Sequence, residues 1–313
     1  MQIFKKTPTF NFMAQSKLAL VFSLSLVFAA VFFLATRGLN FGLDFTGGTL
    51  LEVGYSAPIK PSAVREALHK AGFQDAVVQN FGTSRDILVK LAPRKVKTEG
   101  ESLSDQVLKI LREESSLKVE MRRQEYVGPQ VGNELRDDGG LAMLSALGLI
   151  LVYVMLRFEY RFALGAIIAL VHDVTITLGF FALFQWEFDL TVLAAVLAVI
   201  GYSLNDTIVV FDRIRENFRQ LRKAEALDVI NSSLNQTLSR TIMTSFTTLL
   251  VVFAMFFLGG ELIHSFSMAL LLGIGIGTYS SIYVASSAAL ALKITREHLM
   301  PVVKEGEDQA ERL

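Results

Sequence analysis

The sequence predicts an α-helical integral membrane protein with six transmembrane helices and one small α+β domain. Hydrophobic residues are gathered in blocks about as long as the roughly 20 apolar residues that a membrane-spanning helix needs. A long segment of mixed composition, 37–138, separates the first block from the second. Of the 313 residues, 52% are hydrophobic and 19% are charged, and the mean hydropathy is +0.45. Soluble domains contain about 25% charged residues, so the overall composition departs only a little from theirs. The clustering of the apolar residues therefore identifies the class more clearly than their total.

The composition excludes several functional classes. Thirty basic and thirty acidic residues balance each other, which argues against a basic surface for nucleic acid. The chain contains no cysteine, so it is neither a disulfide scaffold nor a thiol enzyme, and it has no zinc–cysteine site.

Six blocks are predicted to span the membrane. They are 18–36, 139–156, 162–184, 190–211, 238–258 and 266–292. The second block is short unless Gly139 and Gly140 extend it. Core helices of a soluble protein would carry a charged stripe, which these blocks lack. The first block is longer than the 7–15 apolar residues of a cleaved signal and is closed by Arg37, so we expect it to be retained.

Basic residues alternate between the connecting segments, which predicts that both termini are cytoplasmic. They occur in the N-terminal segment 1–17, in 157–161, in 212–237 and in the tail 293–313, but not in 185–189 or 259–265. The segment 37–138 should therefore be periplasmic, because long segments cross the membrane whatever their charge.

The cytoplasmic loop 212–237 is predicted to form an amphipathic helix on the inner membrane surface. In this loop, apolar residues alternate with Arg213, Arg215, Arg219 and Arg222. A plain positively charged anchor is the alternative.

The segment 37–138 has the pattern of a ferredoxin-like domain. Strands are expected at 49–55, 76–81, 87–91 and 119–127, and helices at 62–71 and 103–114. The order β-α-β-β-α-β is that of the ferredoxin-like fold. No nucleophile–base set or metal-ligand cluster occurs here, so we expect a binding or mechanical element and not an enzyme.

A few ionisable residues lie within the apolar blocks, where each charge costs about 3 kcal/mol. Asp206 and Arg240 lie at similar depth in neighbouring spans, so an ion pair is possible. Either the pair is static, or Arg240 extends to the interface, or Asp206 carries protons with Arg240 as its counter-charge. His172 and Asp173, in the middle of the third span, are either a second part of a proton path or a buried pair satisfied by neighbouring helices.

Small residues recur every four positions in the last span, including Gly273, Gly277 and Ser281. Such a stripe lets two helices approach closely. We expect packing within the chain, with a dimer face or a sliding surface as alternatives. No metal site and no cofactor other than the coupling proton are expected.

Six ordered segments resemble the SecF family, the smaller half of the bacterial SecD–SecF protein-export complex. They are GLDFTGGT (42–49), VGPQVG (127–132), VHDV (171–174), GYSLNDT (201–207), DRIREN (212–217) and SSIYVA (280–285). The resemblance implies half of an RND-type (resistance–nodulation–division) transporter, with SecD as the other half. In this family an Asp in the GYSxND motif and an Arg in the SRT motif belong to the proton path, and they match Asp206 and Arg240.

The resemblance also implies a function in the bacterial inner membrane. The chain would work with SecD beside the SecYEG channel and use the proton-motive force to draw unfolded preproteins out on the periplasmic side. A non-transporting scaffold that assembles SecD with the channel, and a small-molecule exporter, are the alternatives.

Overall fold

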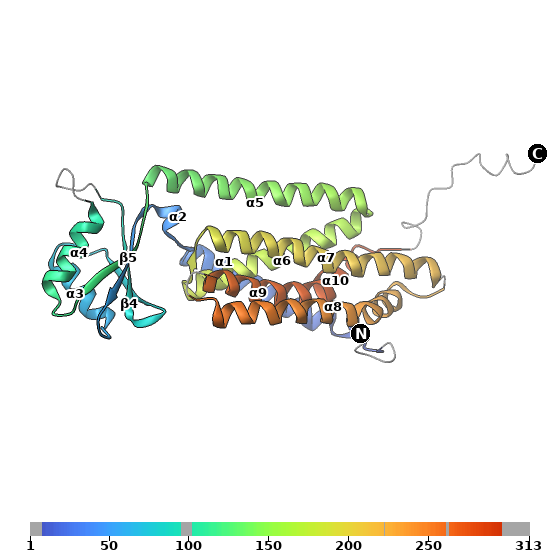
Figure 1. Ribbon diagram of the computed structural model, residues 1–313. Helices are drawn as coiled ribbons and strands as arrows, with labels where there is room; N and C mark the ends of the chain where they lie inside the picture. The colour runs from blue at the N-terminus through green and yellow to red at the C-terminus, as the bar shows by residue number, and fades with distance from the viewer. Residues whose placement is uncertain (1–7, 95–101, 222, 261–262, 296–313) are drawn as a thin grey trace, which may run out of the picture.

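An α+β domain stands at one end of a bundle of long helices (Figure 1). The computed structural model describes residues 8–94, 102–221, 223–260 and 263–295, so parts of the expected terminal segments, 1–7 and 296–313, lie outside the described residues.

The α+β domain, residues 48–127, has the ferredoxin-like topology expected from the sequence. Its elements are β2 (Gly48–Tyr55), α3 (Pro61–Lys70), β3 (Val77–Phe81), β4 (Thr83–Leu91), α4 (Leu103–Glu114) and β5 (Val119–Val127). The strands form one antiparallel sheet in the order β3-β4-β2-β5. In the central pair, Leu51 lies opposite Val89, and both side chains are fully buried.

Helical periodicity explains how α3 and α4 cover this sheet. Val64 and Leu68, four residues apart, are the buried residues of α3, and Pro61 starts that helix. In α4, Ser102 caps the first turn by accepting a hydrogen bond from Asp105 N at 3.1 Å. The two helices and the sheet share one hydrophobic core.

In the described residues, six helical segments are long and apolar enough to cross a membrane, as the fold class requires. They are α1 (Ser16–Thr36), α5 (Pro129–Arg157), α6 (Tyr160–Phe184), α7 (Leu190–Gln220), α8 (Ala226–Leu258), and α9 (His264–Ser280) with its continuation. That continuation is a π-helical turn, η3 (Ser281–Ala285), followed by α10 (Ser286–Ala291). A short 3₁₀ turn, η1 (Met13–Gln15), precedes α1.

The second span begins ten residues earlier than the expected boundary at 139. Pro129 is the first residue of α5, a position that favours proline because its missing N–H needs no partner there. Residues 129–138, which the sequence pattern placed in the α+β domain, therefore form a polar extension of this helix. Hydrophobicity marks the part of a helix suited to lipid, but not the part that continues into water.

The prediction of a separate surface helix in 212–237 is wrong. α7 continues to Gln220 and α8 already begins at Ala226. The apolar side chains of this region, among them Phe211 and Ile214, are fully buried against Val229 and Ile230. The helical periodicity was recognised, but the apolar face packs on a neighbouring helix and not on lipid.

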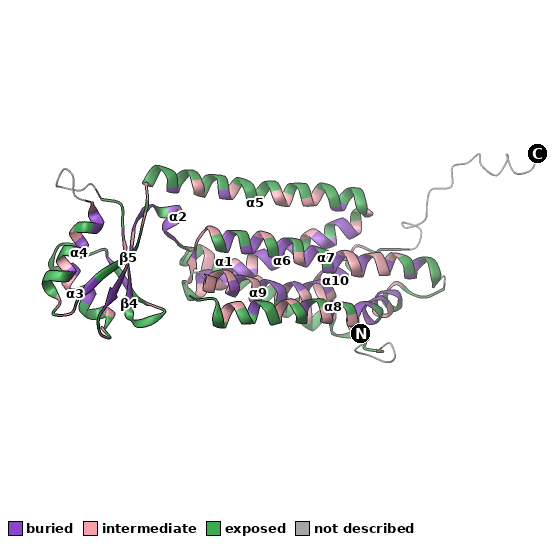
Figure 2. Cartoon of the chain, in the orientation of Figure 1, coloured by how far each residue is buried: buried purple, intermediate pink, exposed green. Residues whose placement is uncertain are grey.

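The bundle exposes apolar residues and buries polar ones, the reverse of the α+β domain. Large hydrophobic side chains are exposed on α1 and α5. Most residues of α5 are exposed (Figure 2), and Leu156 on that helix is 84% exposed. The buried polar residues of the bundle lie mainly on α6, α7, α8 and α9. This is the arrangement expected for helices that face hydrocarbon.

Short segments join the α+β domain to the bundle. β1 (Asn40–Phe41) pairs in parallel with β6 (Glu187–Phe188), which lies between α6 and α7. A single helical turn, α2 (Leu43–Thr46), then leads into β2. The Phe45 ring stacks on Phe188 with 5.9 Å between the ring centroids, and Phe41 contacts both rings.

Candidate functional site

α7 is central to the candidate site, because it packs against α6, α8 and α9. Its buried polar residues are Ser203, Asp206, Thr207 and Asn217. Ser203, Asp206 and Thr207 fall at three- and four-residue spacing, so one stretch of the helix presents them to its neighbours.

Asp206 is 5% exposed and makes one hydrogen bond in the described residues. Its Oδ1 accepts a hydrogen bond from Thr241 Oγ1 of α8 at 3.0 Å. Its Oδ2 is buried without a partner. A carboxylate in such surroundings lacks the compensating contacts that a buried charge needs.

Arg240 does not form the ion pair with Asp206 that its depth made possible. Its side chain is exposed on α8, and no ion pair between the two residues occurs in the described part of the chain. Adjacent residues on a helix point about 100° apart, so Thr241 faces α7 while Arg240 does not. The charge of Arg240 acts on Asp206 only at longer range.

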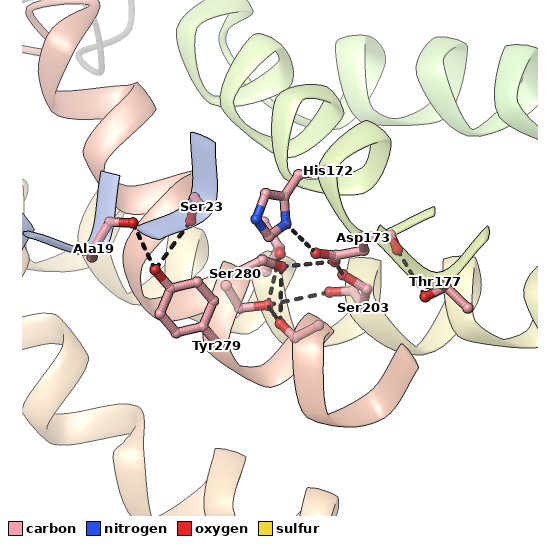
Figure 3. Close-up of polar contacts among 11 residues, drawn as sticks. Ala19, Ser23, His172, Asp173, Thr177, Ser203, Tyr279 and Ser280 are labelled. Atoms are coloured by element: carbon pink, nitrogen blue, oxygen red, sulfur yellow. Dashed lines mark hydrogen bonds and ion pairs between the residues drawn. The ribbon is translucent and has the colours of Figure 1, made fainter. Parts of the chain in front are cut away.

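His172 and Asp173 form a hydrogen-bonded pair in the middle of α6. Asp173 is fully buried, and its Oδ1 lies 2.8 Å from His172 Nδ1. Its Oδ2 accepts hydrogen bonds from Ser203 Oγ at 2.5 Å and from Ser280 Oγ at 2.7 Å (Figure 3). Side chains from three helices thus satisfy this carboxylate.

The second ring nitrogen of His172 lacks a partner. His172 is 6% exposed, and its Nε2 makes no hydrogen bond in the described residues. The ring lies toward α1, where Tyr279 donates a hydrogen bond to Ala19 O at 2.8 Å (Figure 3). A mainly apolar cavity of about 460 Å³ borders the ring between α1, α6 and α10.

Hydroxyl groups of the last span lie next to both acids. Ser280 reaches Asp173, and the next residue, Ser281, is hydrogen-bonded to Thr207 Oγ1 at 3.0 Å, beside Asp206 in the chain. The π-helical turn begins at Ser281. Such turns are frequent at functional sites because they alter which residues face inward.

The small-residue stripe of α9 packs against α7. A Cβ on Gly273 would lie 2.2 Å from Val199 Cγ2, and a Cβ on Gly277 would lie 3.1 Å from Ser203 Cβ. The stripe therefore brings α9 close to α7, and Ser203 of α7 and Ser280 of α9 both donate to Asp173 of α6.

Sequence reasoning singled out the charged residues but missed their partners. Thr207, Thr241 and Ser280 were not predicted as members of the site. Thr207 and Ser280 lie in the segments 201–207 and 280–285 that resemble the SecF family, and Thr241 lies four residues after Thr237 on its helix. Neither signal shows which way a side chain faces, because that depends on the rotation of the whole helix. Within the described residues, no group of three or more potential metal ligands occurs.

Two family models match the chain. One, described as protein export membrane protein SecD/SecF, C-terminal, matches residues 106–295, and the other, the SecD/SecF GG motif, matches residues 32–59. The second range contains β1, α2 and β2, and the first contains α5 to α10.

Curated relatives match over nearly their full length. The chain is 56% identical to the protein translocase subunit SecF of Vibrio alginolyticus over 307 residues, covering 97% of both chains. It is 52% identical to the subunit of the same name from Pseudomonas aeruginosa over 297 residues, covering 95% of both.

Solved structures of SecDF have the same fold. The crystal structure of SecDF from Thermus thermophilus, described as a translocon-associated membrane protein, has a TM-score of 0.84 and 39% identity. A SecDF structure in a super-membrane-facing form has a TM-score of 0.70 and 38% identity. The matches cover 93% and 99% of this chain but only 40% and 41% of the SecDF chains.

Proposed function

The chain belongs to the SecF family of protein translocase subunits, and from this premise we propose that it couples the proton-motive force to protein export together with SecD. In this proposal, Asp206 accepts and releases the coupling proton. The α+β domain then moves and helps to draw unfolded preproteins from the SecYEG channel on the periplasmic side.

The observation that carries the proposal is the state of Asp206. It lies on the central helix, buried, with one carboxylate oxygen unpartnered and no cation in contact among the described residues. A charge at this depth costs about 3 kcal/mol on insertion scales. One proton that crosses the membrane yields about 2.3 kcal/mol per 100 mV, so the two energies are comparable.

A second half of the transporter would complete the site. Arg240, Thr244 and Thr247 are exposed along α8, and Asn205 is exposed on the neighbouring α7. A charged side chain is costly in hydrocarbon, so in this proposal a partner that also spans the membrane covers Arg240 and its neighbours. SecD is the proposed partner, because the chain corresponds to about two-fifths of the SecDF chains that it matches.

The proposed location is the bacterial inner membrane, with both termini cytoplasmic and the α+β domain periplasmic. The support is the distribution of basic residues. Arg157, Arg161, Arg213, Arg215 and Arg219 all lie at the ends of α5, α6 and α7 that are remote from the α+β domain. Such residues mark the cytoplasmic side.

The proposed cycle links this site to the substrate. Protonation of Asp206 removes its charge, α7 shifts against its neighbours, and the α+β domain tilts. Tilting contributes to transport only if the domain binds an unfolded chain more tightly in one state than in the other.

Asp206→Asn tests this function. Assembly with SecD is verified first, and preprotein release is then measured in vesicles with and without a proton gradient. We expect the proton gradient no longer to increase preprotein release, because the amide of asparagine does not gain and lose a proton as a carboxylate does. Asp212→Asn is the matched control, since Asp212 lies on the same helix in a partly exposed pair with Arg157.

A gradient effect that survives Asp206→Asn undiminished would contradict proton coupling through this residue. It would instead favour the scaffold function, in which the chain only assembles SecD with the channel.

A further inference from the structure

Two carboxylates from different parts of the chain hold the start of α7. Asp189 accepts a hydrogen bond from Val192 N at 2.8 Å and caps its own helix. Asp44, in α2, accepts a hydrogen bond from Leu190 N through Oδ2 at 3.0 Å. The first N–H groups of a helix need such acceptors, and negative charge is favourable there. Of these two carboxylates, Asp44 is the one that belongs to another element.

α2 is fixed to the sheet of the α+β domain by close backbone contact. Gly48, the first residue of β2, has φ +131°, and a Cβ there would lie 2.3 Å from Leu91 O in β4. Gly47, with φ +67°, leaves room for Pro129 of α5, whose Cα would lie 2.9 Å from an added Cβ. Movement of α2 is therefore passed directly to the sheet and to the start of α5.

The other contacts at this junction are apolar or end on the connecting strand before α7, as does the hydrogen bond from Gly42 N to Phe188 O at 2.8 Å. Phe45 stacks on Phe188, and apolar stacking permits sliding. Lys90 forms an ion pair with Glu187, which precedes α7 in the connecting strand. The hydrogen bond from Leu190 to Asp44 joins α2 to the first residue of α7 itself.

We propose that Asp44 is a positioning residue that transmits movement of α7 to the α+β domain. α7 carries Ser203 and Asp206 about three and a half to four and a half turns further along, so a shift of the helix along its axis displaces its first residue too. Through Asp44, that displacement reaches α2 and the sheet. The inference rests on the proposed function, because it takes the charge of Asp206 as the cause of the movement.

The test measures the movement directly. The chain has no cysteine, so single cysteines placed at exposed Ala63 in α3 and exposed Phe257 in α8 accept spin labels selectively. The distance between the labels is measured in the assembled complex with a cysteine-free SecD. For each variant the distance is measured twice, once with Asp206 present and once with Asp206→Asn, which imitates the protonated acid.

We expect Asp206→Asn to change the distance in the parent chain and Asp44→Ala to abolish that change. Asp44→Asn should retain it, because the amide oxygen still accepts from Leu190 N. Asp189→Ala should also retain it, since it removes a cap of the same helix end but leaves the hydrogen bond from Leu190 N to Asp44 in place. If Asp44→Ala does not assemble, Asp44→Ser replaces it as the variant with too short a side chain.

Three outcomes would overturn the inference. The first is that Asp206→Asn still changes the distance between the labels fully in Asp44→Ala. The second is that Asp189→Ala abolishes the change as completely as Asp44→Ala does. The third is that Asp206→Asn does not change the distance in the parent chain. The export assay on Asp206→Asn decides the proposed function independently, so failure of the coupling residue and failure of proton coupling are distinguishable.

Discussion

The α+β domain and the helix bundle place their polar residues in opposite ways. The α+β domain has an apolar core, with Leu51 and Val53 fully buried, and a charged surface. The bundle exposes large apolar side chains such as Leu156 and buries Asp173, Asp206 and several hydroxyl groups. Apolar packing determines the structure of the first, whereas specific hydrogen bonds between helices determine the interior of the second.

The largest expected effect on stability concerns the buried carboxylate of Asp173 in the bundle. Asp173→Ala removes the buried carboxylate that His172, Ser203 and Ser280 contact, which should lower the free energy of unfolding by about 3–5 kcal/mol. Thermal unfolding of the purified complex in detergent measures the loss. Asp212→Ala, which removes a partly exposed ion pair with Arg157, should cost at most about 1 kcal/mol. Equal losses in the two variants would show that the polar interior is not what stabilises the bundle.

The next effect concerns the apolar core of the α+β domain. Leu51→Ala should cost about 2–5 kcal/mol, because it creates a cavity between the sheet and its helices. Leu156→Ala on α5 removes the same atoms from a side chain that is 84% exposed, and should leave stability nearly unchanged. Unfolding can be followed with a fluorophore on a cysteine at Ala63. A large loss for Leu156→Ala would mean that this surface is covered by protein and not by lipid.

The smallest effect appears only in alkali. Burial raises the pKa of Tyr55 in β2 from 10.0 to about 12. Above pH 10 the unfolded chain loses the tyrosine proton while the folded domain keeps it, so stability should fall as the pH rises from 10 to 12. Tyr55→Phe should remove this part of the pH dependence and leave the free energy of unfolding at neutral pH nearly unchanged. The same fluorophore reports both curves, and identical slopes for the two chains would contradict the assignment.

The contrast explains what the sequence could predict. Alternating and helical patterns revealed the order of the α+β domain, because burial there follows hydrophobicity. In the bundle, the six spans were visible for the same reason, but the ends of α5, α7 and α8 were misplaced because their extensions are polar or amphipathic.

The interior of the bundle was harder to predict for a geometric reason. Asp206 and Arg240 share a depth, yet Thr241 and not Arg240 faces the acid. A difference of one residue turns a side chain by about 100°, and this rotation depends on how whole helices pack. Hydroxyl groups such as Ser280 carry no charge or hydrophobic signal, so their role became visible only when three helices were placed together.

The π-helical turn at Ser281–Ala285 has a consequence for how the last span can vary. A π turn holds one residue more than an α-helical turn in the same length. Ser280 and the residues before it are therefore offset in rotation from Ser286 and those after it. Loss of one residue from η3 would therefore give an ordinary α-helical turn of the same length and leave the later side chains against their present neighbours, whereas loss of one residue elsewhere in the span would rotate every later side chain by about 100°.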